Sequence, residues 1–331
     1  MIAQSLSLSK LGKLVLLTGA SGFIGTRVQN LLVDRKYRVR LLTRKLDMAL
    51  PSIGFTVGDL TVPSDCQQAM HKVDIVIHIA GEKRDASRFW PVNVQGTKNL
   101  LAAAMEKGVE RFVHLSSVGV IGADPLQQKV YHEDVPCMPR NQYERSKWEA
   151  EKLVHQAATK GFPVAILRPA NVFGDGDPEK GLLRLMRNVR NGWFVYLGGR
   201  NAICNYIFVE DVAYACLSLA EHPNAIGRTF HLSDDCTLGE FVERVSDELG
   251  VKRSRLELPR PLPDRIRTVL RVMRRLPGFS QSSLALRLIS LNNQARFDTT
   301  RLAEELEFRC PVGWRAGLNR VVRWYRSQGE I

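Results

Sequence analysis

Tyr143 and Lys147 stand four residues apart, and both carry side chains that handle protons. The pattern around them predicts a helix over 142–159, so the two side chains share one helix face. A free tyrosine has a pKa of about 10 and is a poor base at neutral pH. A neighbouring ammonium is expected to lower that pKa by favouring the phenolate. The pair therefore predicts proton transfer to or from a hydroxyl group, with Tyr143 as the acid or base.

Two serines, Ser116 and Ser117, stand at the end of a run over 110–116 that is typical of a buried strand. The carboxyl end of a parallel strand opens on the crevice in which ligands bind. Ser117 is then placed to hydrogen-bond the oxygen atom of a substrate. Because a tyrosine and a lysine at this spacing also occur by chance, the chemistry depends on the elements that position these residues.

The segment TGASGFIG at 18–25 lies between an apolar run over 13–18 and a helical pattern over 23–34. Glycines let the backbone approach a pyrophosphate closely, and a helix N-terminus presents free N–H groups to that anion. Gly25 lets the helix pack close to the strand. The strand, loop and helix together predict a dinucleotide site. Its candidate contacts are Gly19, Ser21, Gly22, Phe23, Ile24 and Gly25.

The residues after the second predicted strand, 38–43, distinguish between two dinucleotides. An acidic side chain there binds a ribose 2′-hydroxyl, but this chain has Arg44 and Lys45. Because two cations suit a 2′-phosphate, NADP(H) is favoured and NAD(H) is the alternative. A positively charged nicotinamide would lower the pKa of Tyr143 further. Cofactor contacts are also expected where the third and fourth strands end, at Asp59, Leu60, Ala80 and Gly81.

Strand and helix patterns alternate over the first 170 residues, which is typical of a parallel sheet with right-handed crossovers. We expect an α/β fold: a Rossmann doubly wound parallel sheet with helices on both faces and a smaller C-terminal substrate lobe. Residues 1–170 are assigned to the NAD(P)-binding domain, and 171–331 to a lobe partly interleaved with the sheet. Further strands are predicted at 55–57, 74–80, 164–167, 206–209 and 229–233, helices at 90–107, 181–190 and 314–327, and a loop at 171–180.

Composition and charge indicate which classes of partner the chain is expected to bind. The 331-residue chain has a formal net charge of +13, which suits an anionic ligand or surface, or only keeps the protein soluble. Basic residues gather at 252–275 without a recognition motif or interleaved aromatics, so nucleic-acid binding is not expected. The six cysteines lack metal-like spacing, so no metal is expected, and they fit a reducing cytoplasm. No apolar run approaches the roughly 18 residues of a membrane span.

The chain as a whole resembles the extended short-chain dehydrogenase/reductase family, also called the NAD-dependent epimerase/dehydratase family. The resemblance covers nearly the whole chain, and its motifs are specific for the family and much less so for a substrate. They are TGASGFIG, GDL at 58–60, HIAG at 78–81, NVQGT at 93–97, HLSSVGVIG at 114–122, YERSK at 143–147, LRPANVFG at 167–174, FVEDVA at 208–213 and the terminal FDTTRLAEELEF.

The resemblance implies a role for each matching position. Ser117, Tyr143 and Lys147 match the family's catalytic triad, and Lys147 is also expected to hold the nicotinamide ribose. Asn93 matches a structural asparagine. Pro169 to Val172 match the segment beside the nicotinamide, with Pro169 and Val172 as cofactor contacts and Asn171 as a substrate contact. The family also implies a homodimer through the helices over 90–107 and 142–159.

Departures from the family's patterns reduce the number of reactions that the chain is expected to catalyse. Dehydratases of the family carry an Asp-Glu pair directly after the catalytic hydroxyl residue, where this chain has Val118 and Gly119. Epimerase-reductases of the fucose-synthase kind carry a cysteine at the position of Gly119. Two interpretations remain for a nucleotide-sugar substrate: a 4-keto-sugar reductase and a 4-epimerase. Arg44 favours the reductase, because an exchanging NADPH suits net reduction.

Two alternatives stay open beside the nucleotide-sugar interpretation. The segment at 259–280 resembles the C-terminal part of the 3β-hydroxysteroid dehydrogenase and dihydroflavonol reductase branch, which implies a lipophilic ketone or alcohol. Its basic stretch over 260–276 is interpreted as a peripheral membrane contact, a flap over the substrate or a packed surface helix. A cofactor-binding scaffold or redox sensor is the non-enzymatic alternative, but such family members usually lose the tyrosine or the lysine.

Overall fold

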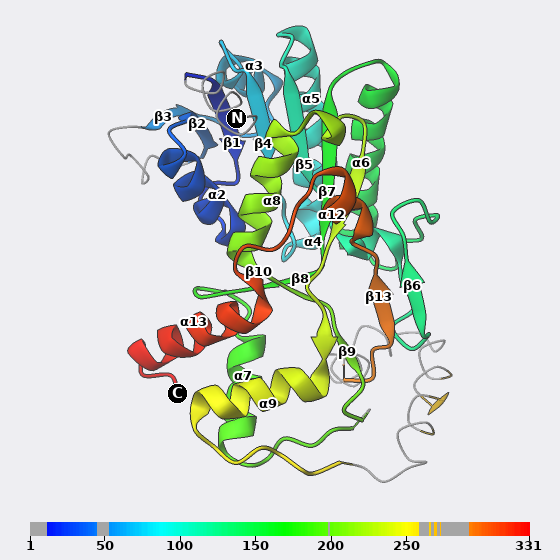
Figure 1. Ribbon diagram of the computed structural model, residues 1–331. Coiled ribbons are helices and arrows are strands. Elements are labelled where there is room, and N and C mark those ends of the chain that lie inside the picture. The colour runs from blue at the N-terminus through cyan, green and yellow to red at the C-terminus, as the bar shows by residue number, and fades with distance from the viewer. Residues whose placement is uncertain are drawn as a thin grey trace.

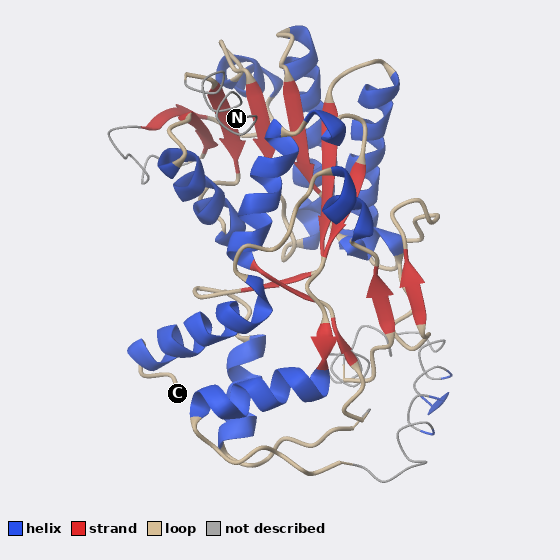
Figure 2. Ribbon diagram, viewed as in Figure 1, coloured by secondary structure: helices blue, strands red, loops and turns tan. Residues whose placement is uncertain are grey.

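The computed structural model describes residues 12–44, 53–197, 199–257 and 291–331, together with Arg265, Thr268, Val269 and Val272. Its centre is a seven-stranded sheet in the order β11-β7-β5-β4-β1-β2-β3, and all of its strand pairs are parallel. Figures 1 and 2 show this sheet in the upper half of the molecule. The strands are β1 (Leu14–Thr18), β2 (Arg38–Thr43), β3 (Ile53–Val57), β4 (Ile75–His78), β5 (Arg111–Leu115), β7 (Val164–Pro169) and β11 (Thr229–Leu232).

Helices cover both faces of the sheet, because its central strands are apolar on both sides. One face packs against α2 (Phe23–Asp34), α8 (Val209–Glu221) and α12 (Thr300–Glu305). The other packs against α3 (Pro63–Ala69), α5 (Gly96–Glu106) and α6 (Gln142–Thr159). All five residues of β1 are buried, as a continuous apolar run predicts for a parallel strand inside such a sandwich. The predicted fold class is confirmed.

The C-terminal lobe lies below the sheet in Figure 1 and has its own core. Its helices are α7 (Gly181–Arg190), α9 (Leu238–Leu249) and α13 (Gly313–Ser327). They enclose a cluster of aromatic rings in which Phe241 contacts Phe173, Tyr206 and Trp314. Two short ladders lie within 171–331: β8 (Asn171–Phe173) with β10 (Tyr206–Phe208), and β9 (Ile203–Cys204) with β12 (Cys236–Thr237). A third, β6 (Lys129–Tyr131) with β13 (Ala295–Phe297), joins residues of the first 170 to the C-terminal part.

The chain passes between the sheet and the lobe several times. After the first lobe segment, α8 returns to the sheet and β11 pairs with β7, with Phe230 opposite Leu167. The last strand of the sheet therefore comes from beyond residue 170. The two regions 1–170 and 171–331 share one sheet rather than meeting at a single linker.

The helix predicted over 90–107 is present, but its first turns are π-helical rather than α-helical. The structure has a short α4 (Ala86–Arg88), a π-helical turn over Phe89–Gln95 and then α5. Pro91 lies in this turn and has no N–H to donate, so it cannot complete a regular α-helical ladder there. The wider turn brings Asn93 into the interior, where its amide nitrogen donates to Glu82 O and Ser146 Oγ.

Two predictions around residue 170 also need correction. β7 does not end at Leu167 but continues through Arg168 and Pro169, because β11 extends beside it and places Leu232 opposite Pro169. The predicted loop over 171–180 begins with a strand, β8, which pairs with β10 some 35 residues later. Neither pairing is visible locally, since both partners lie far away in the sequence.

Most of the basic segment over 260–276 lies outside the described residues, as does Lys45. Val269 and Val272 are described, and both are helical and more than half exposed. Among the described residues, no helix is long and apolar enough to cross a membrane.

Candidate active site

A cleft of about 1510 Å³ separates the carboxyl edge of the sheet from the C-terminal lobe. A dinucleotide and a small substrate together need more room than one ordinary ligand pocket, which holds roughly 300–1,000 Å³. The cleft wall brings together all of the predicted site residues: Gly19, Ser21, Gly22, Phe23, Ile24, Gly25, Arg44, Asp59, Leu60, Ala80, Gly81, Ser117, Tyr143, Lys147, Pro169, Asn171 and Val172.

The glycine loop is closed by contacts that exclude side chains. Gly19 has a φ of 76°, and a Cβ atom there would lie 2.7 Å from the backbone nitrogen of Ala80. A Cβ atom on Gly25 would lie 2.0 Å from the carbonyl oxygen of Gly19. No side chain caps the N-terminus of α2, whose N-cap residue is Gly22. The first N–H groups of α2 therefore stay available to an anion in the cleft, so this end of the cleft fits a pyrophosphate.

Arg44 and Asp59 mark the far end of the cleft, where the adenosine is expected. The Asp59 carboxylate accepts hydrogen bonds from the backbone nitrogen and the hydroxyl of Thr61, both at 2.9 Å. Burial acts to raise the pKa of Asp59, but the Thr61 bonds and the charges of Arg44 and Arg88 hold it below its usual value. Asp59 is thus ionised, and its negative charge offsets part of the positive charge that Arg44 would present to a 2′-phosphate.

Lys147 is almost completely buried and donates to the carbonyl oxygen of Leu115 at 2.6 Å. Leu115 is the last residue of β5, so this bond ties α6 to the strand end that leads into Ser117. Burial lowers the pKa of Lys147 to about 8, and the charge of Glu151 opposes that shift. Two of the three N–H bonds of the ammonium remain for a ligand.

Tyr143 differs from the sequence-based expectation. Its pKa is raised to about 12, chiefly by burial and secondarily by the negative charges of Glu144 and Glu179. The Tyr143 ring packs edge-on against Phe89, with 5.8 Å between ring centroids. The expected lowering by Lys147 is not found in the protein alone, because burial dominates the pKa of Tyr143 and the charges of Glu144 and Glu179 add to it. The positive charge of a bound nicotinamide would act in the opposite direction.

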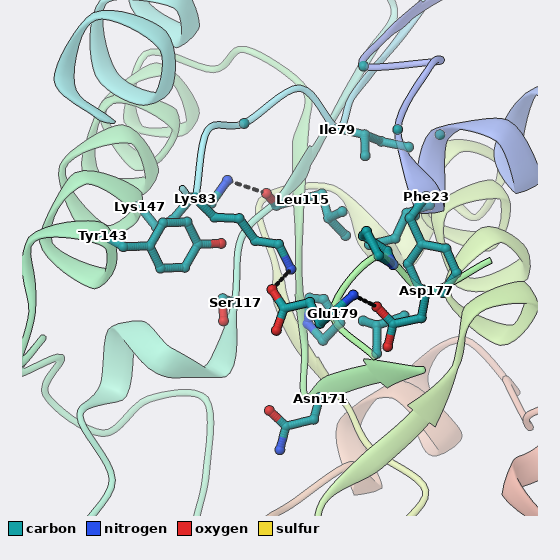
Figure 3. Close-up of a pocket in the computed structure, with 18 of the residues that line it drawn as sticks. Phe23, Ile79, Lys83, Leu115, Ser117, Tyr143, Lys147, Asn171, Asp177 and Glu179 are labelled. Atoms are coloured by element: carbon teal, nitrogen blue, oxygen red, sulfur yellow. Dashed lines mark hydrogen bonds and ion pairs between the residues drawn. The ribbon is translucent and has the colours of Figure 1, made fainter. Parts of the chain in front are cut away.

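Ser117 follows β5 and caps a short 3₁₀ helix over Val118–Ile121. Its hydroxyl oxygen accepts a hydrogen bond from the backbone nitrogen of Gly119 at 3.1 Å. That bond fixes the oxygen and leaves the hydroxyl hydrogen free to donate. Figure 3 shows Tyr143 and Ser117 close together on one side of the cavity, with Asn171 beyond Ser117.

The lobe side of the cleft contains residues that the sequence did not single out. Asn205, Asn293 and Phe297 belong to this wall, together with Ile203, Cys204, Tyr206, Ala295 and Trp324. The Oδ1 atom of Asn205 is buried without a hydrogen-bond partner among the described residues. No sequence motif marks these positions. They come from β9, β10, β13, their flanks and α13, which lie far in the sequence from Ser117, Tyr143 and Lys147.

Two ion pairs cross from the sheet domain to the segment 174–180 of the lobe. Arg27 on α2 donates to the backbone oxygen and the carboxylate of Asp175 at 2.8 and 2.7 Å. Lys83 lies 2.8 Å from the carboxylate of Glu179. Figure 3 shows Lys83 extending across the cavity to Glu179. These pairs hold the 174–180 segment beside the glycine loop, and neither follows from local sequence patterns.

The chemistry of these groups fits a dinucleotide. The described residues contain no group of three or more histidine, cysteine or acidic side chains arranged to hold a metal. The profile of the NAD dependent epimerase/dehydratase family matches residues 15–232. The chain belongs to this family. It is therefore an enzyme of the extended short-chain dehydrogenase/reductase type, an NAD-dependent oxidoreductase or epimerase.

Relatives within this family act on two kinds of substrate. The chain is 27% identical over 320 residues to an N-acetyl-α-D-glucosaminyl-diphospho-ditrans,octacis-undecaprenol 4-epimerase of Escherichia coli O157:H7, covering 94% of each chain. It is 29% identical over 333 residues to sterol demethylase protein B of Methylococcus capsulatus, covering 96% of this chain and 99% of that protein.

A solved structure, that of gox2253, superposes with a TM-score of 0.76 at 26% identity. The match covers 96% of this chain and 99% of gox2253. The likeness thus extends through the lobe as well as the sheet.

Proposed function

We propose that this family member transfers a hydride to or from a ring carbon of a sugar that is carried on a diphosphate, as in a nucleotide-sugar. The observation that carries the proposal is the set of uncommitted polar groups around Tyr143 and Ser117. No hydrogen bond from another described residue reaches the exposed Asn171 side chain, and among the same residues the buried Oδ1 atom of Asn205 has no partner. Amide groups both donate and accept, so they match sugar hydroxyls, which do the same.

One of these groups weighs against an apolar substrate. A sterol ring filling this part of the cleft would remove water from the exposed Asn171 side chain without offering it a hydrogen bond. Each unsatisfied polar group costs about 1–3 kcal/mol. A sugar hydroxyl can hydrogen-bond the Asn171 amide, and a sugar can place a C–H face against Phe297 in the same wall. The Asn171 amide therefore favours a sugar over a sterol by about 1–3 kcal/mol.

The side chains divide the proton chemistry between them. The bound nicotinamide supplies or accepts the hydride. Tyr143 is protonated at neutral pH, so it is ready to donate a proton to the carbonyl oxygen as a ketone is reduced. Ser117 donates a hydrogen bond to the same oxygen, and Lys147 holds the nicotinamide ribose from its anchor on Leu115. Arg44 suits an exchanging NADPH and hence net reduction, so we favour a 4-keto-sugar reductase over a 4-epimerase.

NADP(H) is the proposed cofactor, and Arg44 supports this preference. The residue that follows β2 is a cation instead of a carboxylate, and it lines the cleft. We propose that NAD(H) also binds at this site, but more weakly than NADP(H). Asp59 makes this possible because it offsets some of the charge of Arg44.

The proposal is tested with purified protein, NADPH or NADP⁺, and two ligands: a UDP-4-keto sugar and a UDP-sugar with a 4-hydroxyl group. We expect NADPH to be consumed in proportion to the keto sugar and little exchange of the 4-hydroxyl sugar. Formation of a 4-epimer without net NADPH loss would assign the epimerase instead. Absence of both reactions, with turnover of a steroid alcohol, would refute the sugar proposal.

A lipophilic alcohol or ketone is the second candidate. Ile203, Ala295 and Phe297 form an apolar part of the wall, and a relative that is 29% identical bears the name of a sterol demethylase protein. The substitution Asn171→Leu separates the two candidates. It should weaken turnover of a sugar and improve, or leave unchanged, turnover of a steroid.

A further inference from the structure

Glu151 and Arg168 form an ion pair that is cut off from water. Their side chains are 0% and 3% exposed. Arg168 Nε lies 3.1 and 3.2 Å from the two carboxylate oxygens, and Nη2 makes a third contact with Glu151 Oε1 at 2.5 Å. Burying two charges costs desolvation energy that often cancels their attraction. A stabilising role alone is therefore a weak explanation for placing this pair in the interior.

The pair joins the three segments that carry the candidate catalytic groups. Glu151 lies one helical turn beyond Lys147 on α6. Ser116, the residue before Ser117, donates its hydroxyl to Glu151 Oε2 at 2.5 Å. Arg168 directly precedes Pro169, which lies in the cleft wall. One carboxylate thus contacts the ends of β5 and β7 while belonging to the helix of Tyr143 and Lys147.

The charges around Lys147 make Glu151 its principal counter-ion. The titratable or charged groups that face Lys147 or its partners lie on several elements. They are Tyr143, Glu151 and His155 on α6, His78 on β4, His114 on β5, Arg168 on β7, His231 on β11, and Glu133 and Cys137 between β6 and α6. Burial and the charge of Lys147 lower the pKa of His78 to about 3, so that ring is neutral. The same causes hold His114 neutral, and within the part of the chain that the structure describes neither of its ring nitrogens has a hydrogen-bond partner.

Glu151 itself stays ionised. Burial acts to raise its pKa, but hydrogen bonds from His155, Arg168 and Ser116 and the charge of Arg168 lower it to about 2. Its negative charge is therefore constant over the working range of pH. Because Arg168 and Ser116 also hold the carboxylate in place, its distance from Lys147 is set by the fold.

We propose that Glu151 is a positioning residue for catalysis. Its carboxylate ties the strand ends that lead to Ser117 and Pro169 onto the helix of Tyr143 and Lys147, and it supplies the negative charge that keeps the buried Lys147 an ammonium. This rests on the proposed roles of Tyr143 and Lys147 in hydride transfer. It does not depend on the identity of the substrate.

The test measures NADH binding against pH, because Lys147 is expected to hold the nicotinamide ribose and no substrate is needed. NADH is used since it lacks a 2′-phosphate, which would titrate near neutral pH. Wild-type affinity should fall as the pH rises past about 8, where Lys147 loses its proton. In Glu151→Gln the loss should begin at a pH lower by about one unit or more, since a nearby opposite charge is worth that much.

Glu149→Gln is the matched control, because Glu149 lies on the same helix and pairs with Lys152 toward solvent. It should keep the wild-type profile. Superimposable profiles for Glu151→Gln and wild type would overturn the proposal, even if the variant turned over slowly. If the pH profile of NADH binding moves in Glu151→Gln but the protein reduces no sugar, the role of Glu151 is supported and only the substrate assignment is refuted.

Circular dichroism checks that Glu151→Gln is folded. If it is not, Glu151→Asp and Ser116→Ala decide the question, since both keep the negative charge. The wild-type pH profile of NADH binding should then persist while NADH binds several-fold more weakly at every pH, because the strand ends are no longer held to α6. Wild-type affinity in both variants, or a profile moved to lower pH in either, would overturn the proposal.

Discussion

Replacing Arg44 with alanine should weaken NADPH binding far more than NADH binding. The two cofactors differ only in the 2′-phosphate, so the interactions of the adenine, pyrophosphate and nicotinamide cancel in the ratio of their dissociation constants. Arg44 is exposed and stands beside the ionised Asp59. What remains in the ratio is the attraction between one guanidinium and one phosphate.

The size of this attraction follows from its surroundings. A charge pair 4 Å apart near a protein surface interacts by about 4 kcal/mol, and a hydrogen bond to a charged group nets about 1.5–3 kcal/mol. Exposure and the competing Asp59 carboxylate place Arg44 at the lower end of that range. We expect a loss of about 2 kcal/mol, or roughly 30-fold in the dissociation constant of NADPH.

Fluorescence titration of NADPH and NADH measures the two constants. Arg38→Ala is the matched control, because Arg38 is also exposed but stands at the opposite end of β2 and does not line the cleft. The NADPH effect should shrink as salt rises, since the Debye length falls to about 10 Å at 0.1 M. Equal losses for both cofactors in Arg44→Ala would refute the 2′-phosphate assignment.

Three further outcomes are expected. Tyr143→Phe removes the proton donor, so turnover should fall at least 100-fold while NADPH binding survives; normal turnover would contradict the mechanism. Gly25→Ala would bring a Cβ atom within 2.0 Å of Gly19 O, so thermal stability and cofactor affinity should both drop, whereas Gly54→Ala, with 3.6 Å to its nearest neighbour, should change neither. If the basic stretch 260–276 lies on a membrane, the protein should co-sediment with anionic vesicles at low salt and not with neutral ones; protein left in the supernatant in both cases argues against that contact.

Local patterns predicted several elements of the sheet domain and one helix of the lobe well. The bounds of α2, α6 and β2, and of α7 in the lobe, coincide with those expected from apolar spacing and glycine positions. These elements are amphipathic or continuously apolar, so their periodicity reports directly on what they bury. The glycine loop and the Tyr-Lys spacing are also local patterns, so the candidate site could be predicted from them.

What the sequence missed depends on contacts between distant segments. β8 could not be predicted, because its partner β10 is the reason it is extended. The protonation state of Tyr143 was also missed, since it depends on burial and on Glu179 from the lobe. Asn205 gave no local signal, and only the meeting of the lobe with the sheet places it in the cleft.

The position of β11 has a consequence for synthesis on the ribosome. Until Thr229–Leu232 have emerged, one edge of β7 presents unpaired N–H and C=O groups, and such an edge invites pairing with other chains. About 60 residues separate the end of β7 from the end of β11, which at roughly 5–20 residues per second is about 3–12 s of exposure. A nascent chain that stalls within this window carries a nearly complete nucleotide-binding half with an open sheet edge. Ribosome pausing between 170 and 232 is therefore where this protein is most exposed to aggregation and most in need of a chaperone.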